Sequence, residues 1–355
     1  MKKTVVFFLS LLMCANLVFA QGTKESSTPK TGEKQFEGQE LVVATWGWNA
    51  ANVKKLSAAF EDKYGVEILI DETAGNSDRL NKIMAQKNNP EIDVAFLSDS
   101  FAVIGNEKGL FEKIDTSVVT GLDNLYDFAL NKDGFGPSFS LVRYGLIYNK
   151  DLVEKPESYL DLFSDEYKGL VALPDATTSA GPYLLISMAE ELGGSQENIQ
   201  PALDYIDEYK DNIAHWYTTS SEVQTGFTTG EIAVALFMDI NLPLLAKSGI
   251  NVGWTDAKEG SFSAAATVNV VKGSINPELA QLYVQYLISD EVQDQIADVL
   301  NEAPTNKNVT ISEDKAVFLA GNSEAITSLR EFDFDYINEN KADWINQFQR
   351  IIVSK

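Results

Sequence analysis

Segments typical of buried strands alternate with segments of helical periodicity along this chain, and that alternation leaves few folds open to it. The first strand pattern, ELVVATWGW at 40–48, is followed by apolar residues at helical spacing, Val53, Leu56, Phe60 and Tyr64. Gly65 then supplies the left-handed residue that commonly ends a helix. A further strand pattern, EIDVAFLSDS, occupies 91–100. The alternation predicts an α/β protein with a mainly parallel sheet.

The strand patterns of this first part end in aromatic or polar side chains. Trp46 and Trp48 end the first pattern, and Ser98 and Asp99 end the pattern at 91–100. Ligands of open α/β sheets bind at the carboxyl ends of the strands. Taken singly, each of these residues is explained equally well by packing or by helix capping. Their joint placement favours ligand contact, and we predict it for all four.

A second series of strands and helices follows. Strand patterns occur at 138–149 (SFSLVRYGLIYN), 169–175 (GLVALPD) and 230–239 (GEIAVALFMD), and Asp239 ends the last of them. Two similar α/β halves are the simplest interpretation. The remainder is mainly helical, with a capped apolar stripe beginning at Asn276-Pro277. It is expected to return the chain to the first half.

The N-terminus has the features of an export signal. Residues 1–20 carry Lys2 and Lys3, then an apolar run, and end in small side chains at Ala20. The mature chain is predicted to begin near Gln21, with 21–39 as a flexible tether. Cys14 is the only cysteine of the chain. The alternative is a lipoprotein anchored through Cys14, and either outcome places the protein in the periplasm or outside the cell.

The charge of the chain argues against one class of partner. It has 52 acidic and 28 basic residues, a formal net charge of −24. A surface this acidic repels the phosphate backbone, so no nucleic-acid partner is predicted.

The segment LVVATWGWNAANVKKLSAAFEDKYGVEI resembles the opening strand and helix of the periplasmic solute-binding proteins of ABC importers. Five further segments resemble that family's motifs in the same order: EIDVAFLSDS, LIYNKDLV, EYKGLVALPDATTSAGP, TGEIAVALF and the segment from AKEGSFSAAATVNVVKG to YLISDEVQ. The similarity spans nearly all of the mature chain and is closest to the spermidine/putrescine-binding branch.

The resemblance implies a two-lobed periplasmic binding protein fold of type II, with a hinge between two mixed, mainly parallel sheets. Lobe 1 is then formed by 40–143 and 269–355, and lobe 2 by 144–268. The lobes close like a Venus flytrap on a small solute, with crossing segments near 143–148 and 265–269. It also implies a monomer that delivers the solute to an ABC transporter permease, without cofactor or metal.

In the polyamine-binding branch, an acidic pair follows the strand at the position that LPDATT occupies in this chain. A Trp with a nearby Asp follows the KEG motif of that branch. Here Asp175 matches the first carboxylate, but Ala176 stands at the second, and Ser263 and Ala265 replace the Trp and Asp. An ammonium group needs carboxylates and aromatic faces when it leaves water. The available candidates for an amine are Trp46, Trp48, Asp99, Asp175 and Asp239.

The stretch LPDATTSAGP at 173–182 predicts an anion site as well. Thr177, Thr178 and Ser179 precede a helix, whose N-terminal N–H groups and partial positive charge suit a carboxylate, phosphate or phosphonate. Arg143 is expected to assist the anion, with Tyr144 beside it. A positive helix end beside acidic residues fits a ligand that carries both an amine and an anionic group, and it also fits a neutral polyol. We rank an amine-bearing solute first, polyamines included, and an oxyanion-bearing solute second.

Catalysis is not predicted. His215 is the only histidine, and neither a Ser-His-Asp order nor a G-x-S-x-G elbow is present. A secreted glycosidase with two acids is the enzymatic alternative, and a secreted adhesin is a third class. No residue is predicted to be catalytic or to bind a metal.

Overall fold

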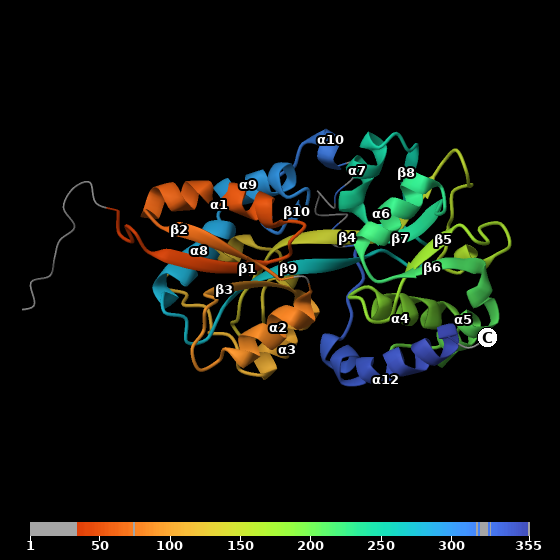
Figure 1. The fold of residues 1–355 in the computed structure, drawn as a ribbon, viewed down its shortest axis with the longest axis horizontal. Helices are drawn as coiled ribbons and strands as arrows, with labels where there is room; N and C mark the ends of the chain where they lie inside the picture. Colours follow the sequence, from red (N-terminus) through yellow and green to blue (C-terminus); the bar gives the residue numbers. More distant parts are fainter. Residues whose placement is uncertain (1–33, 74, 317–318, 320–325, 327, 354–355) are drawn as a thin grey trace, which may run out of the picture.

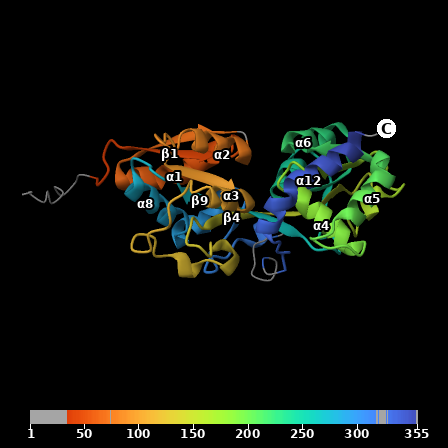
Figure 2. The same ribbon diagram turned by 90° about the horizontal axis from the view of Figure 1, so that it is seen from below.

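The computed structural model describes residues 34–73, 75–316, 319, 326 and 328–353 (Figure 1). The predicted signal peptide, Cys14 and most of the tether lie outside these residues. Two bodies lie side by side and are joined at a waist (Figure 2). Within the described part of the chain, no helix combines the length and apolar character that crossing a bilayer requires.

The first body, lobe 1, is built on three parallel strands and their helices. Strand β1 pairs in parallel with β2 on one side and β3 on the other. The elements are β1 Glu40–Thr45, α1 Ala50–Tyr64, β2 Glu67–Glu72, α2 Asn76–Ala85, β3 Val94–Ser98, α3 Asp99–Glu107, α8 Pro277–Leu287, α9 Asp290–Val299, and the short 3-10 helices η1 Leu122–Asn124 and η2 Asp127–Ala129. Helix α1 ends at Gly65 with a φ of 74°, as its position after the apolar stripe predicts.

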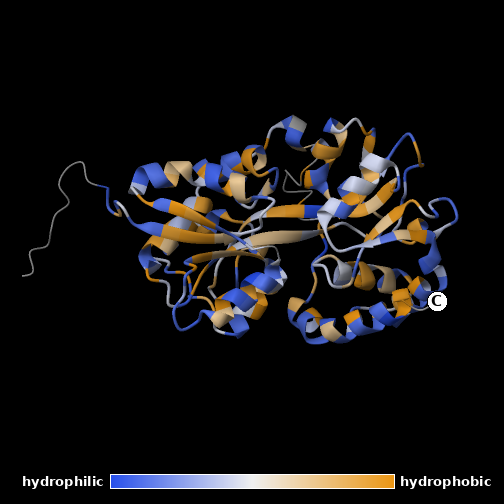
Figure 3. Cartoon of the chain, in the orientation of Figure 1, coloured by the Kyte–Doolittle hydropathy of each residue, from blue (hydrophilic) through white to orange (hydrophobic). Residues whose placement is uncertain are grey.

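The second body, lobe 2, repeats the arrangement. Strand β5 lies between β6 and β7 and is parallel to both. Its elements are η3 Asp161–Phe163, β5 Val171–Pro174, α4 Gly181–Glu191, α5 Gln200–Tyr209, η4 Lys210–Asn212, β6 Ile213–Tyr217, α6 Ser220–Thr229, β7 Val234–Met238, η5 Asp239–Asn241, α7 Leu242–Lys247 and β8 Val252–Thr255. Both lobes therefore contain the parallel strands expected from the alternating sequence pattern, and the central strands are coloured mostly as hydrophobic in Figure 3.

Two long strands, β4 (Ser138–Asn149) and β9 (Phe262–Val270), run through the waist (Figure 1). Strand β4 pairs with β9 as far as Tyr144 and with β7 from Tyr144 onward, while β9 passes from β4 to β3 at Ala266. Hydrogen bonds thus join the two predicted sheets into one path, β2-β1-β3-β9-β4-β7-β5-β6, with β8 and β10 (Ala303–Pro304) also on β4. The exchange points lie inside the segments predicted to cross.

Helix α12 (Phe334–Val353) packs against α4 and α5 of lobe 2 and also against α3 of lobe 1, where Asn338 donates to the Ser100 carbonyl oxygen. Ile337, Trp344 and Phe348 are buried in the same apolar cluster as Leu184 and Ile206. The predicted boundary places 269–355, which contains α8, α9 and α12, in lobe 1. We propose that 334–353 belong to lobe 2. The short helix α10 (Glu313–Ala316) lies between the two groups in the sequence.

Candidate functional site

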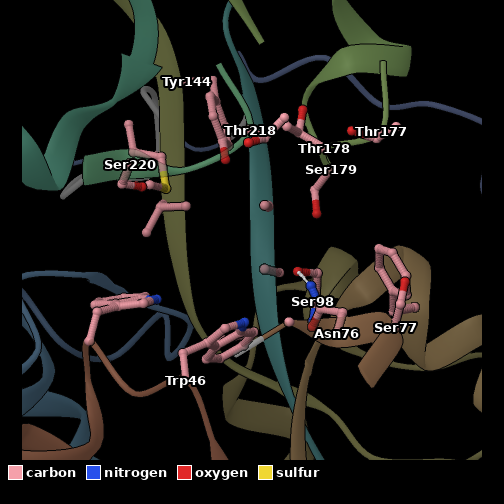
Figure 4. A pocket seen from close by; sticks show the side chains of 18 of the residues that line it. Trp46, Asn76, Ser77, Ser98, Tyr144, Thr177, Thr178, Ser179, Thr218 and Ser220 are labelled. Carbon is pink, nitrogen blue, oxygen red and sulfur yellow. Dashed lines mark hydrogen bonds between the residues drawn. The ribbon is translucent and has the colours of Figure 1, made fainter. Parts of the chain in front are cut away.

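A cavity of about 320 Å³ lies between the lobes, beside β4 and β9. Side chains from lobe 1 form one wall and side chains from lobe 2 the facing wall (Figure 4). Its lining residues are Trp46, Trp48, Gly75, Asn76, Ser77, Ser98, Phe101, Val142, Tyr144, Thr177, Thr178, Ser179, Tyr217, Thr218, Ser220, Met238, Ala264, Ala265, Ala266 and Glu302. Seven of the predicted contact residues are in this set: Trp46, Trp48, Ser98, Tyr144, Thr177, Thr178 and Ser179.

The lobe 1 wall begins where β1 and β3 end. The indole rings of Trp46 and Trp48 have centroids 6.3 Å apart, and the Trp48 side chain is 57% exposed. Asn76 donates from Nδ2 to the Ser98 hydroxyl at 2.9 Å and accepts the Ser98 N–H at 3.1 Å. Figure 4 shows this pair pointing toward the opposite lobe. The pair ties the start of α2 to the start of α3.

A buried arginine packs behind the Trp46 ring of this wall. The guanidinium of Arg79 lies 4.9 Å from the Trp46 ring and donates to the carbonyl oxygens of Phe96 and Thr73. Arg79 is fully buried, and burial lowers its pKa to about 10. No ion pair to it is found among the described residues. The Asp71 carboxylate is the negative charge that acts on it, and this interaction opposes the lowering of the Arg79 pKa by burial.

The lobe 2 wall is built around the predicted elbow. The Asp175 carboxylate accepts the backbone N–H and the hydroxyl of Thr177 through Oδ1, and the Gln349 amide through Oδ2. Gly181 is required at the start of α4, because a Cβ there would lie 2.3 Å from the Asp175 carbonyl oxygen. Asp175 is 4% exposed. It shapes the elbow from behind and is not among the lining residues.

Four helices begin at the cavity. Asn76 and Ser77 open α2, Ser98 precedes α3, the elbow precedes α4, and Ser220 opens α6. The first N–H groups of a helix have no partner within the helix, and the helix dipole is positive at that end. Hydroxyl groups of Thr218 and Ser220 join those of the elbow on the lobe 2 side (Figure 4). The hydroxyls of Thr177 and Thr178 donate to Asp175, and that of Thr218 donates to Glu222. The hydroxyls of Ser77, Ser98, Ser179 and Ser220 are lining donors for which the described residues show no protein acceptor.

The Arg143 side chain lies on the face of β4 that points away from the cavity, and Asp239 of η5 lies beside it. Side chains alternate along a strand, and Val142 and Tyr144 are the β4 residues that face the cavity. Asp239 accepts the Arg143 backbone N–H at 3.1 Å, and its Oδ2 lies 3.9 Å from Arg143 Nε. Burial raises the pKa of Asp239 to about 7, although Arg143 acts to lower it. Arg143 and Asp239, both predicted to contact the ligand, thus contact each other and join β4 to η5.

The remaining parts of this charged cluster come from β8 and the residue after it. The Arg143 guanidinium lies 4.7 Å from the Trp254 ring centroid and 3.4 Å from an Asp256 carboxylate oxygen. These contacts hold the guanidinium beside β8. The structure does not bring Arg143 to the elbow that it was predicted to assist.

Asp99 also serves the backbone. Its carboxylate accepts the N–H of Ser100 at 2.8 Å and that of Ala265 at 3.2 Å, which ties α3 to the crossing strand β9. Burial raises its pKa to about 6, and these two hydrogen bonds oppose the rise. Asp99 is not among the lining residues.

Sequence reasoning did not find Asn76, Ser77, Thr218, Ser220 or Glu302. The first four had a usable signal, since each stands just after a strand pattern and at the start of a helix. Glu302 had none, because it reaches the cavity by the pairing of β10 with β4. No group of three His, Cys, Asp or Glu side chains in the described ranges is arranged to hold a metal ion.

Comparison with known proteins agrees with this architecture. Residues 55–318 match the family model described as bacterial extracellular solute-binding protein. The crystal structure of an ABC transporter from Clostridium perfringens is 32% identical, with a TM-score of 0.76 over 88% of this chain and 99% of that one. The spermidine/putrescine substrate-binding protein PotD from Streptococcus pneumoniae is 20% identical, with a TM-score of 0.72 over 88% of this chain and 99% of that one.

A curated relative, the putrescine-binding periplasmic protein PotF of Escherichia coli, is 23% identical over 301 residues, which cover 77% of this chain and 80% of PotF. The predicted two-lobed periplasmic binding protein fold is confirmed. The relatives are substrate-binding proteins of ABC transporters, which bind a small solute and work with a membrane permease. The chain belongs to the bacterial extracellular solute-binding proteins and is a receptor of an ABC importer, not an enzyme.

Proposed function

We propose that this receptor captures a small solute carrying an oxyanion, a carboxylate, phosphonate or phosphate, in the cavity between its lobes. The observation that carries the proposal is the convergence of four helix starts on one cavity. Backbone N–H groups and hydroxyls at such ends bind anions, and the helix dipoles favour negative charge there. The buried charge of Arg79 adds to the same potential.

The contact residues follow from the cavity. We assign anion contact to Asn76, Ser77 and Ser98 from lobe 1 and to the elbow 177–179 from lobe 2. The Tyr144 hydroxyl and the Trp46 and Trp48 rings complete the enclosure. Asp99, Asp175 and the pair Arg143–Asp239 are assigned supporting positions, because their polar atoms are engaged by the protein.

A polyamine is the second candidate, favoured by the names of the putrescine-binding and spermidine/putrescine-binding relatives. A diamine needs a carboxylate at each end. Glu302 is the one carboxylate among the lining residues. The donor-rich walls offer nothing comparable to the second ammonium group, so we rank this candidate below the oxyanion.

Isothermal titration of the exported chain separates the two. The panel contains short carboxylates, phosphonates and phosphate, with and without amino groups, together with putrescine and spermidine. We expect micromolar or tighter binding of an oxyanion without turnover. Binding of the polyamines with no binding of any oxyanion would contradict the proposal.

We propose that residues 1–20 direct export and that the receptor works as a monomer. Mass spectrometry of the mature protein identifies its first residue: Gln21 indicates signal cleavage after Ala20, and an acylated Cys14 indicates the lipoprotein. Sedimentation of the soluble chain tests the monomer.

A further inference from the structure

Glu302 is a buried carboxylate at the cavity that the oxyanion site does not use. It is 3% exposed, directly precedes β10 and is a lining residue. Asn49 donates to Oε1 at 3.0 Å, and the Ser140 hydroxyl donates to Oε2. Both donors are neutral, and no cationic side chain of the described residues pairs with Glu302.

The surroundings of Glu302 contain more acceptors than donors. Asn49 is 3% exposed, and its Oδ1, on the same amide that donates to Glu302, has no hydrogen-bond partner. Each carboxylate oxygen can accept about two hydrogen bonds, so Glu302 keeps spare acceptor capacity. An unpaired buried acceptor costs free energy. An alkylammonium group supplies three donors and no acceptor, together with the missing positive charge.

The tryptophans suit the same group. An ammonium is attracted to the face of an indole ring, most strongly to Trp among the aromatic residues. One face of Trp46 is taken by the Arg79 guanidinium, whereas Trp48 is more than half exposed and has no cation over its ring in the described part of the chain. Trp48 is therefore the better platform for an amine entering from the opening of the cavity.

We propose that Glu302 binds the ammonium group of the solute, and that the solute is therefore a zwitterion, an ω-amino carboxylate or an aminoalkylphosphonate. This inference rests on the proposed function, because the oxyanion end is held by the helix starts. The amine end lies at Glu302 and Trp48. A diamine fits only the amine end of the site, and a simple carboxylate fits only the oxyanion end.

The test compares each zwitterion with its deaminated analogue: 3-aminopropionate with propionate, 4-aminobutyrate with butyrate, and 2-aminoethylphosphonate with ethylphosphonate. Titration of the wild-type chain is expected to give at least tenfold tighter binding of the better zwitterions than of their analogues. In Glu302→Gln, which keeps the size and the hydrogen-bonding shape, we expect that advantage to fall at least tenfold. Glu72→Gln is the matched control, because Glu72 is exposed near the Trp48 loop and is not a lining residue.

A deaminated anion that still binds Glu302→Gln with wild-type affinity shows that the variant is folded and that its oxyanion site is intact. Equal affinity of each zwitterion and its analogue for the wild type would overturn the inference and leave the proposed function standing. An undiminished zwitterion advantage in Glu302→Gln would also overturn it. Failure of every oxyanion to bind the wild type would instead overturn the proposed function.

Discussion

The two faces of β4 carry different polar groups. The face toward the cavity presents Val142 and Tyr144, and the helix starts around it offer hydroxyls and N–H groups. The opposite face presents Arg143, which is paired with Asp239 and Asp256 and covered by Trp254. The full charges of the back face therefore lie beside one another within the protein, whereas the cavity face carries neutral polar groups, among which the hydroxyls of Thr177, Thr178 and Thr218 donate to protein acceptors. A charged residue in a hinge strand therefore predicts the binding site only when the face of the strand that it occupies is known.

The largest effect is expected on the back face. Arg143→Met removes the cation beside the fully buried Asp239, and breaking a buried ion pair commonly costs about 3 kcal/mol or more. We expect urea unfolding to show a loss of this order, with little change in ligand affinity for the folded fraction. The double variant Arg143→Met/Asp239→Asn should recover much of the loss, because Asn keeps the acceptor for the Arg143 N–H. A large loss of affinity with unchanged stability would move Arg143 to the ligand.

The pH dependence of stability gives the next effect. Burial raises the pKa of Glu302 to about 7 from its ordinary value of 4.5, so the folded state binds this proton more tightly than the unfolded state. Stability from this group is therefore fully present below pH 4.5 and is lost as the pH rises through 7, by about 3 kcal/mol. Urea unfolding of wild type and Glu302→Gln at pH 5 and pH 8 should show the wild type losing more stability between the two. Identical losses would mean that Glu302 is not buried in this way.

Asp175 distinguishes support from contact on the cavity side. Asp175→Ala removes the acceptor of the Thr177 N–H and hydroxyl, so the elbow loosens and oxyanion affinity should fall about tenfold, or about 1.4 kcal/mol. Asp175→Asn keeps an acceptor oxygen and should stay within about threefold of the wild type. Titration calorimetry measures both. If the two variants lose equal affinity for an amine-bearing ligand, Asp175 is a charge partner of that ligand.

The smallest expected effect is at the elbow hydroxyls. Ser179→Ala deletes one lining hydroxyl, and a single hydrogen bond contributes about 1 kcal/mol or less, which is about fivefold in affinity. Fluorescence titration through Trp46 and Trp48 can follow it. Ser164→Ala, at an exposed site that is not a lining residue, is the control. A change in the control as large as in Ser179→Ala would remove the elbow from the site.

The elements were largely predictable because their signals are local. Alternating strand and helix patterns predicted the two α/β halves, and Gly65 marked the end of α1. The elbow was predicted from the polar residues between β5 and α4, and it lines the cavity. The lobe to which α12 belongs is harder to predict, since the pattern of an amphipathic helix does not indicate which core receives its apolar face.

The charged members of the candidate site were not predictable in the same way. Asp175 and Asp239 carry the carboxylate that an amine contact requires, but each carboxylate accepts a backbone N–H of the protein. Their roles depend on which face of a strand they occupy and on what lies behind that face. A shift of one residue along the strand exchanges the faces.

The sequence by itself determined the local structure: where strands end, where helices begin, and that polar groups gather at those junctions. Those features depend on side-chain periodicity and turn chemistry within a few neighbouring residues. Only the tertiary structure decided which junctions share a cavity and which charges are already paired. The Asn49–Glu302 contact joins residues 253 positions apart, and it exists because β10 pairs with β4 at the waist. Long-range pairing of this kind carries no local signal.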